Sequence, residues 1–304
     1  MESLTHLEQA FTRLFRIDEW ESDPGFSRFI PMVYDPIGFD WRRFFEAEFV
    51  RRFNGLMLKG REQVHTVFLA VFPTDEVLKR FLDESAPGDL LFMHHPLLME
   101  CSDPRGRWGR GFVPIGRDLL LALKEKELSV FTCHLPMDTS WPLGTGGAIM
   151  EALQADPIQP FCPAGNGHAG MICRVTATDT RSLIDRLTTL FDIPYVDFEG
   201  KERARIERIA ILPGCGDVAA MMREAEASGA DAYVTGEIHC HIDNEYGRTK
   251  YATVMAYAAE TSMSLIGVSH AASEYLVMKT QVKPWLEERF SVNVTLLPQS
   301  RWWW

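Results

Sequence analysis

Histidines in this 304-residue chain gather where predicted strands end, next to carboxylates that could bind a metal with them. In an open α/β sheet, ligands bind at the carboxyl ends of the strands. Nitrogen and oxygen donors without thiolates favour Zn, Mn, Fe, Co or Ni over a structural zinc held by cysteines. The pattern predicts a metal site. Its six histidines are His94, His95, His134, His239, His241 and His270.

The spacing of these residues indicates two metal ions rather than one. Neighbouring side chains of an extended chain point to opposite faces, so we expect His94 and His95 to diverge. Such a pair suits two ions roughly 3.5–4 Å apart. His270 and Glu274 are four residues apart and would share one face of a helix. Asp138 adds a hard oxygen ligand that can bridge two ions.

The elements that must position these residues alternate between strand and helix from about residue 56. Short apolar runs, each followed by an amphipathic stretch, are typical of an α/β protein. Residues 1–47 form a predicted N-terminal extension with helical spacing, and residues 157–170, rich in Pro and Gly, are the candidate break between two lobes of a 48–300 domain. The predicted strands are 64–71, 90–93, 128–133, 171–177, 208–212, 232–235, 265–268 and 292–297, and the predicted helices are 74–84, 118–127, 183–191, 217–228 and 274–290, the last interrupted at Pro284.

Composition narrows the class of partner to a small-molecule substrate. The 31 Lys and Arg against 42 Asp and Glu give a net charge of −11, which argues against a nucleic-acid or acidic membrane surface. We find no secretory signal and no run of 18 apolar residues, and expect a cytoplasmic protein. The six cysteines lack a C-x-x-C pair and are interpreted as reduced thiols.

Two glycine-rich segments invite a cofactor assignment. Residues 165–170 match G-x-G-x-x-G, but the segment follows a loop and precedes a strand, so we reject dinucleotide binding. Residues 213–217 join a strand to a predicted helix and could present N–H groups to a phosphate. A tight strand-to-helix turn without a ligand explains that segment equally simply.

The histidine segments resemble those of the Nif-three-like family (NGG-interacting factor three-like), dinuclear-metal-centre hexameric proteins often named GTP cyclohydrolase type 2 homologues. The resemblance covers about residues 54–297 and is carried by His-His-Pro, His-x-x-x-Asp, Thr-Gly-Glu-x-x-x-His and His-x-x-Ser-Glu. It implies a two-lobed α/β fold of mixed sheets flanked by helices, a metal site in the cleft between the lobes, and a homohexamer. It also implies the metal ligands His94, His95, Asp138, His270 and Glu274, and additional cleft residues Glu237, His241 and His134.

The chain departs from the family pattern away from these ligands. Phe72 stands where the family commonly has an Asp, and His168 replaces an Arg in a Gly-x-Gly-Arg segment. The sequence also ends in Trp302, Trp303 and Trp304, which we expect to pack at a subunit contact because an apolar tail in water favours association.

Two divalent ions would lower the pKa of a bridging water and polarise the bond under attack. We therefore interpret the chain as a metal-dependent hydrolase acting through a metal-bound hydroxide, and the family names suggest a ring C–N bond of a cyclic amide or purine-like molecule. Glu237 or His241 would be the general acid or base, or would orient a ligand. Two alternatives stay open: phosphoester hydrolysis by the same ions, and a non-catalytic metal-binding scaffold.

Overall fold

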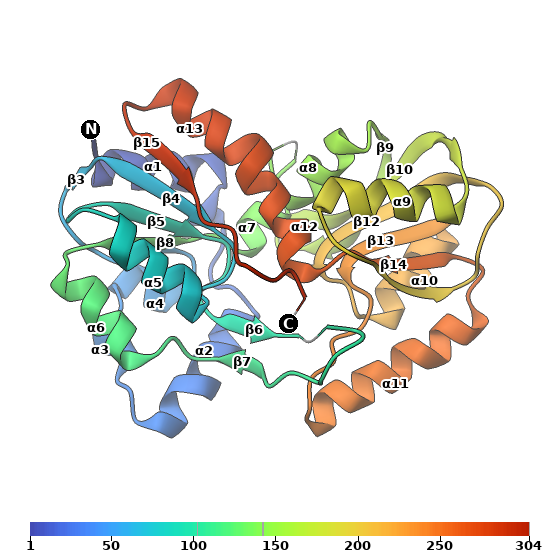
Figure 1. Cartoon of the computed structure of the whole chain (residues 1–304), viewed down its shortest axis with the longest axis horizontal. Coiled ribbons are helices and arrows are strands. Elements are labelled where there is room, and N and C mark those ends of the chain that lie inside the picture. Colours follow the sequence, from blue (N-terminus) through green and yellow to red (C-terminus); the bar gives the residue numbers. More distant parts are fainter. Residues whose placement is uncertain (102, 142, 304) are drawn as a thin grey trace. The chain divides into compact units, whose positions relative to one another are not determined.

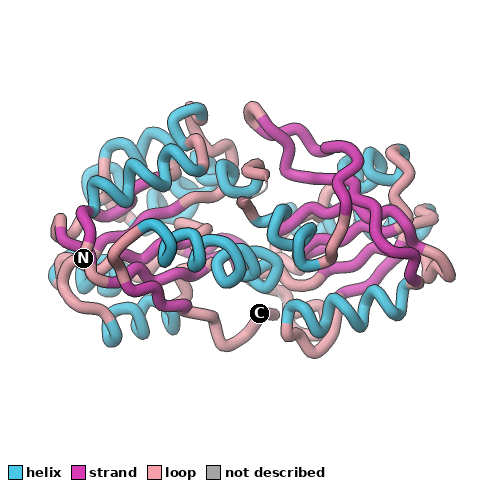
Figure 2. The backbone as a smooth tube through the Cα atoms, turned by 90° about the horizontal axis from the view of Figure 1, so that it is seen from above, coloured by secondary structure: helices cyan, strands magenta, loops and turns pink. Residues whose placement is uncertain are grey.

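The computed structural model describes residues 1–101, 103–141 and 143–303 and divides into two compact units. The first unit comprises residues 1–99, 112–137 and 278–300. The second comprises residues 100–111, 138–277 and the described residues after 300. Each unit has its own sheet flanked by helices (Figures 1 and 2), which confirms the predicted α/β class.

The first unit is built on a five-stranded sheet in the order β15-β4-β5-β8-β2. Strands β15, β4, β5 and β8 are parallel, and β2 is antiparallel to β8. Its strands and helices are β1 Glu2–Ser3, α1 Leu4–Leu14, η1 Ile17–Glu19, α2 Phe26–Tyr34, η2 Asp35–Ile37, α3 Trp41–Phe44, α4 Ala47–Arg52, β2 Gly55–Leu58, β3 Gln63–Val64, β4 Thr66–Ala70, α5 Asp75–Glu84, β5 Leu90–Met93, β6 Leu98–Glu100, β7 Gly111–Val113, α6 Arg117–Glu125, β8 Ser129–Thr132, α7 Leu135–Asp138, η3 Met278–Val282, α13 Lys283–Arg289 and β15 Asn293–Leu296.

Strand β5 is buried on both faces, as expected for a central parallel strand. Leu91 and Met93 belong to the core that includes α5, while Phe92 packs against Phe11 of α1, with ring centroids 4.7 Å apart. Figure 1 shows α1 and α13 on one side of this sheet and α5 and α6 on the other. The predicted cap of α5 is confirmed, because the Thr74 hydroxyl accepts the N–H of Val77.

The second unit is built on a six-stranded mixed sheet in the order β11-β14-β13-β12-β10-β9. Strands β12, β13 and β14 are parallel, and the other neighbours pair antiparallel. Its strands and helices are α8 Thr145–Ala152, β9 Asp156–Ala164, β10 Gly167–Thr178, α9 Thr180–Phe191, β11 Asp197–Gly200, β12 Ile206–Cys215, α10 Ala219–Ala227, β13 Ala232–Glu237, α11 Glu245–Glu260, β14 Ser264–Gly267 and α12 His270–Val277.

Helices α10 and α11 cover one face of this sheet, and α8, α9 and α12 lie on the other (Figure 1). Met222 of α10 and Tyr257 of α11 share a buried cluster with Tyr233 of β13. Residues 157–170, where the sequence suggests a break between lobes, lie in the β9–β10 hairpin of this unit. Helix α11 escaped prediction because few of its side chains are buried and its apolar positions form no clear stripe.

The helical stretch after β14 begins and breaks at positions different from those predicted. Helix α12 starts at His270, four residues before the predicted start. The interruption is the π-helical segment 278–282, and Pro284 lies in the first turn of α13, where its missing N–H costs no helical hydrogen bond.

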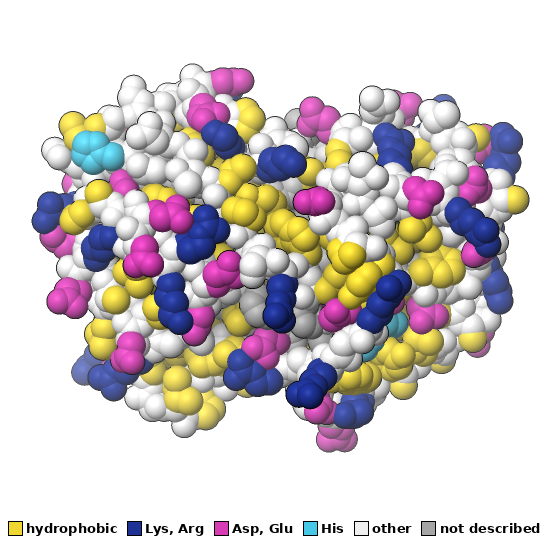
Figure 3. All heavy atoms as spheres, in the orientation of Figure 1, with side chains coloured by type: hydrophobic (Ala, Val, Ile, Leu, Met, Phe, Trp, Pro, Cys, Tyr) yellow, Lys and Arg dark blue, Asp and Glu magenta, His cyan; other side chains and the backbone are white. Residues whose placement is uncertain are grey.

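Acidic and basic side chains are interspersed on the face drawn in Figure 3, with apolar side chains between them. Such mixing gives that face no extended field of one sign. Within the described residues, no helix has both the length and the apolar character needed to cross a membrane.

Candidate metal centre

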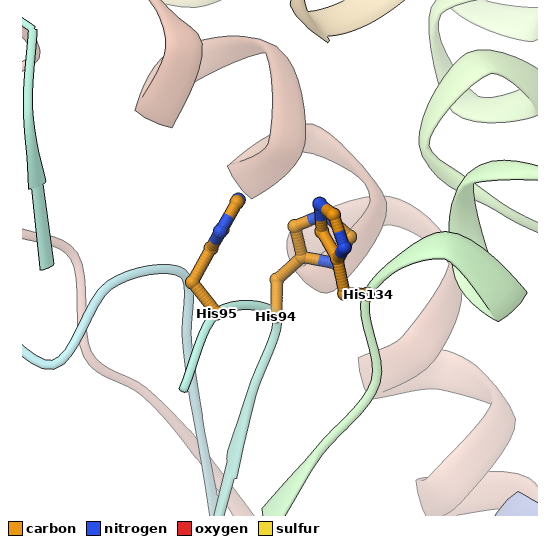
Figure 4. Close-up of side chains that lie close together, drawn as sticks. All are labelled: His94, His95 and His134. Atoms are coloured by element: carbon orange, nitrogen blue, oxygen red, sulfur yellow. The ribbon is translucent and has the colours of Figure 1, made fainter. Parts of the chain in front are cut away.

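Three imidazoles meet at the end of the sheet in the first unit, and we call them the histidine cluster: His94, His95 and His134. His94 and His95 follow β5, His134 follows β8, and these parallel strands pair from Leu90 with Ser129 onward, so they end side by side. One ring nitrogen from each histidine lies within 4.8 Å of the others. Figure 4 shows the three rings together beyond the strand ends.

The expected divergence of His94 and His95 is wrong. Their ring centroids are 4.6 Å apart, with the ring planes at 86°. The alternation of an extended strand does not apply to them because β5 ends at Met93, and His94 lies in a bend. The two side chains therefore serve one small region of space.

Hydrogen bonds fix how His94 and His134 present their rings. The Nδ1 of His94 lies 2.7 Å from the carbonyl oxygen of Cys133. Because a carbonyl only accepts, this Nδ1 carries the proton, and Nε2 is the ring atom with a lone pair for a metal. The Nδ1 of His134 lies 2.7 Å from Oδ2 of Asp23. Metal-binding histidines usually have such a carbonyl or carboxylate partner.

The partner of His134 is a fully buried carboxylate. Burial alone would raise the pKa of Asp23, but the charge and hydrogen bond of His134, with the N–H groups of Phe26 and Gly25, outweigh burial and lower that pKa below its usual value. Asn54 accepts the backbone N–H of His134 at 2.7 Å. Sequence reasoning missed Asp23 and Asn54, because neither lies near a histidine along the chain.

Aromatic rings enclose the rest of the histidine cluster. Phe72 stacks on His95 with ring centroids 4.3 Å apart and planes at 20°. Phe26 meets both His95 and His134 edge-on, at 5.6 and 4.7 Å. Phe72, which replaces the expected Asp, therefore packs directly against a predicted ligand.

The second unit brings together an imidazole and three carboxylates, which we call the acidic cluster: Asp138, Glu237, His270 and Glu274. In the first turn of α12, Nε2 of His270 lies 2.9 Å from Oε1 of Glu274, as their spacing predicts. Nδ1 of His270 lies 3.5 Å from Oε2 of Glu237 at the end of β13. A carboxylate oxygen of Asp138 lies within 4.8 Å of one of Glu274.

The surrounding charges set the protonation of His270. Burial would lower its pKa, but Glu274 and Glu237 raise it well above the ordinary value. These two carboxylates therefore favour the protonated form of the His270 ring. Asp138 is oriented by Thr145, whose hydroxyl donates to Oδ1 at 2.7 Å.

The backbone around the acidic cluster leaves room for these side chains. Gly214 has a φ of +69°, and a Cβ there would come within 2.6 Å of Glu274 Oε1. The N–H of Gly214 is donated to Ser273 Oγ and that of Gly216 to Thr235 Oγ1. These two donors are thus used inside the protein and do not support a phosphate site in residues 213–217, where β12 continues through Cys215 instead of ending at residue 212.

His241, expected in the cleft, lies among aromatic rings of the second unit. Trp108 and Tyr251 lie beside it, with ring centroids at 5.5 and 5.4 Å. Burial lowers the pKa of His241, against the opposing charge of Glu237. The ring is therefore a neutral base near pH 7.

An additional acid and histidine adjoin these rings. Nδ1 of His239 lies 3.3 Å from Oδ2 of Asp197, without the alignment of a hydrogen bond. Burial, then repulsion from Glu199 and Glu237, raises the pKa of Asp197 to about 7. Burial lowers the pKa of His239 to about 4. Asp197 was not predicted, since it opens β11, a polar edge strand with no apolar pattern.

The described tryptophans of the tail pack within their own unit. Trp303 is buried, stacks on Tyr195 with planes at 5°, and donates its indole N–H to the Tyr195 carbonyl at 3.2 Å. The carbonyl of Trp302 accepts the hydroxyl of Ser269. Trp303 is thus buried within its own unit and Trp302 is half-buried, while the expected subunit contact stays a prediction. Trp304 lies outside the described residues.

Comparison with known proteins identifies relatives over most of the chain. The model of the Duf34/NIF3 (NGG1p interacting factor 3) family matches residues 51–301. The "GTP cyclohydrolase 1 type 2 homolog" of Pyrococcus abyssi is 26% identical over 247 residues, 80% of this chain and 88% of that protein. The protein of the same name from Halobacterium salinarum is 29% identical over 218 residues, 68% and 80% of the two chains.

Solved structures share the fold. Protein ybgI, described as of unknown function, has a TM-score of 0.70 at 17% identity over 99% of both chains. Reduced HcgD from Methanocaldococcus jannaschii has a TM-score of 0.61 at 18% identity, over 88% of this chain and 94% of that one. At these identities the likeness concerns the fold alone.

Proposed function

This chain belongs to the Duf34/NIF3 family, and on that premise we propose that it is a dinuclear metal-dependent hydrolase that cleaves a C–N bond of a cyclic amide or purine-like small molecule. The histidine cluster carries the proposal. His94 and His134 have their Nδ1 atoms engaged by a carbonyl and a carboxylate, the usual arrangement of metal-binding histidines. The names of the curated relatives support a cyclohydrolase-like reaction.

The residues present fit divalent ions. We assign His94 and His95 as nitrogen donors, and Asp138, His270 and Glu274 as donors to the same pair of ions. The two sets are complementary in kind: the first unit offers imidazoles, while the second offers mostly carboxylates, one of which can bridge two ions. The open backbone at Gly214 supports a ligand role for Glu274, because any other residue would crowd its carboxylate.

When bound, the ions would supply water activation near neutral pH and polarisation of the bond under attack. Glu237 would position His270, since it contacts the Nδ1 of that ring at 3.5 Å. His241, neutral near pH 7, would exchange a proton with the substrate's ring nitrogen. Trp108 and Tyr251 beside it offer flat surfaces suited to a planar heterocycle.

The test has two stages. Elemental analysis of purified protein should find at least two divalent ions per chain, and His95→Ala and Glu274→Ala should each lower the content by up to two ions, because we assign both residues to one dinuclear centre. The loaded protein is then screened against cyclic amides, purine nucleotides and phosphodiesters. We expect release of a ring-opened product, lost on chelation and reduced at least 100-fold in His241→Gln.

Other screening results would assign a different function. Turnover of phosphodiesters alone would favour a phosphoesterase, although the internal use of the Gly214 and Gly216 N–H groups removes one support for it. A fully loaded protein that turns over no substrate of these classes would contradict the hydrolase and favour a metal-binding scaffold.

A further inference from the structure

Three cysteines that are far apart in the sequence meet in the second unit. Cys215 ends β12, Cys240 lies just beyond β13, and Cys101 precedes both by more than a hundred residues. The thiol of Cys240 interacts with those of Cys101 and Cys215 and donates to Oε2 of Glu237 at 3.1 Å. From the sequence, the six cysteines are interpreted only as reduced thiols, and this convergence is not predicted.

A carboxylate completes the group, which we call the thiol cluster: Cys101, Cys215, Asp217 and Cys240. One ligand atom each from Cys215, Asp217 and Cys240 lies within 4.8 Å of the other two. Cys215 and Asp217 flank Gly216, where a Cβ would lie only 2.4 Å from Oγ1 of Thr235 and 2.7 Å from the hydroxyl of Tyr233, so glycine lets the chain pass this close to β13.

One carboxylate oxygen of Asp217 is buried without a hydrogen-bond partner among the described residues. The residue is 2% exposed, and its Oδ1 accepts from the ammonium of Lys250. Its Oδ2 is buried and has no hydrogen-bond partner among the described residues. A buried carboxylate oxygen left in this way costs free energy unless a donor or a cation satisfies it.

We propose that the thiol cluster is a metal site of its own, in which Cys215, Cys240 and Asp217 bind one zinc-class divalent cation, with Cys101 as the fourth donor beside Cys240. Thiolates and carboxylates are both ligands of Zn²⁺, which prefers four ligands. Tetrahedral Zn–S bonds of about 2.3 Å place two sulfurs about 3.8 Å apart. The donors, within 4.8 Å of one another, need only small side-chain movements to close on a cation.

The charge balance also favours a cation here. Asp217 is already compensated by the ammonium of Lys250. Cysteine binds a metal as the thiolate, so a divalent cation that replaces the protons of Cys215 and Cys240 adds no net charge to them and releases two protons to solvent. Cys101, as the fourth donor, releases a third proton and leaves the loaded site with one net negative charge.

The thiol cluster adjoins the acidic cluster, since Cys101, Glu237 and His270 each offer a ligand atom within 4.8 Å of the other two. Its thiol donors nevertheless give a signal of their own, so the proposal does not rest on the proposed function. We would titrate Co²⁺ into the reduced, demetallated full chain and record the ultraviolet absorption. Thiolate ligands give a sulfur-to-cobalt charge-transfer band that histidine and carboxylate ligands do not. We expect this band to saturate at one equivalent, to persist in a His95→Ala, Glu274→Ala double variant, and to fade as Zn²⁺ displaces the cobalt.

Variants test the ligands one at a time. Cys215→Ser should abolish the band. Cys173 is a buried thiol that donates a hydrogen bond to the Met171 carbonyl, and Cys173→Ser should leave the band unchanged. Asp217→Asn keeps the side-chain shape and should weaken Co²⁺ binding at least tenfold. Absence of the band in the wild type, a band unaffected by Cys215→Ser, or a mass showing only a reversible loss of two hydrogens with no cobalt binding would overturn the proposal; the last would make the cluster a disulfide pair.

Discussion

The histidine cluster and the acidic cluster hold their imidazoles in place by opposite means. In the first unit, a neutral carbonyl and one buried carboxylate hold the rings, and phenylalanine rings pack around them. In the second unit, two carboxylates flank His270 directly and favour its protonated form. Under the proposed function, His94 would therefore offer a lone pair to a metal directly, whereas His270, whose pKa is raised, would first have to lose a proton.

The largest expected effect concerns the acidic cluster. Glu274→Ala removes a predicted ligand and the main charge beside His270, so we expect metal affinity to fall at least 100-fold, since even the loss of an indirect partner costs 10–100-fold. Competition with a chelating dye measures this. Glu260→Ala, an exposed acid of the same unit that pairs with Arg223, should change nothing. Equal metal retention in both variants would exclude Glu274 as a ligand.

We expect a smaller loss of metal affinity when Asp23, the carboxylate that holds His134 of the histidine cluster, is changed. Asp23→Asn keeps an oxygen for the N–H groups of Gly25 and Phe26 but removes the charge beside His134. Metal affinity should fall about 10–100-fold. Isothermal titration with Zn²⁺ measures it, and thermal unfolding of the apoprotein controls for folding. Unchanged affinity would show that the charge beside His134, whose ring packs against both His94 and His95, does not support the metal site.

The raised pKa of Asp197 in the second unit should make the stability of the protein depend on pH. The pKa of Asp197, about 7 when folded against 3.8 when exposed, means that the native state binds the extra proton between these values. The contribution of this group to the free energy of unfolding therefore falls as the pH rises from 4 to 7, by about 1.4 kcal/mol per pH unit. Above pH 7 the contribution no longer changes.

Asp197→Asn removes this dependence. From pH 4 to 7 the wild type should lose on the order of 3 kcal/mol relative to the variant, measured by urea unfolding at each pH. His239, with its pKa lowered to about 4, contributes the opposite slope in both proteins, so the comparison isolates Asp197. Parallel stability curves would show that Asp197 is ionised throughout.

Contacts between residues that are close in the sequence could be predicted better than contacts between residues that only folding brings together. Strand ends and the four-residue spacing placed His134, His270 and Glu274 correctly within their units. The same reasoning could not find Asp23 or Cys101, because no periodicity links them to the residues they contact. It misjudged His94 and His95 because an alternation rule was extended past the end of the strand.

The helices show the same limit. Helix α5 was predicted to its cap because Thr74 and a clear apolar stripe lie within its own sequence. Helix α11, the 16-residue stretch Glu245–Glu260, has no such stripe, since its length is decided by packing on a sheet assembled from distant strands. Local signals thus identified most elements, while tertiary contacts decided the rest.

We expect the smallest effect from Phe72→Leu, a variant that tests whether packing or hydrogen bonding positions the histidine cluster. Phe72→Leu keeps the site apolar and buried but removes the ring stacked on His95. Since an aromatic pair contributes about 0.5–1.5 kcal/mol beyond its burial, Zn²⁺ affinity should fall only about 2- to 10-fold. Titration beside Asp23→Asn makes the comparison direct. Suppose that Phe72→Leu lowered Zn²⁺ affinity as much as Asp23→Asn does. The rings of the histidine cluster would then be held mainly by their aromatic neighbours. The two clusters would differ because packing positions the first, whereas carboxylate charges position His270 in the second.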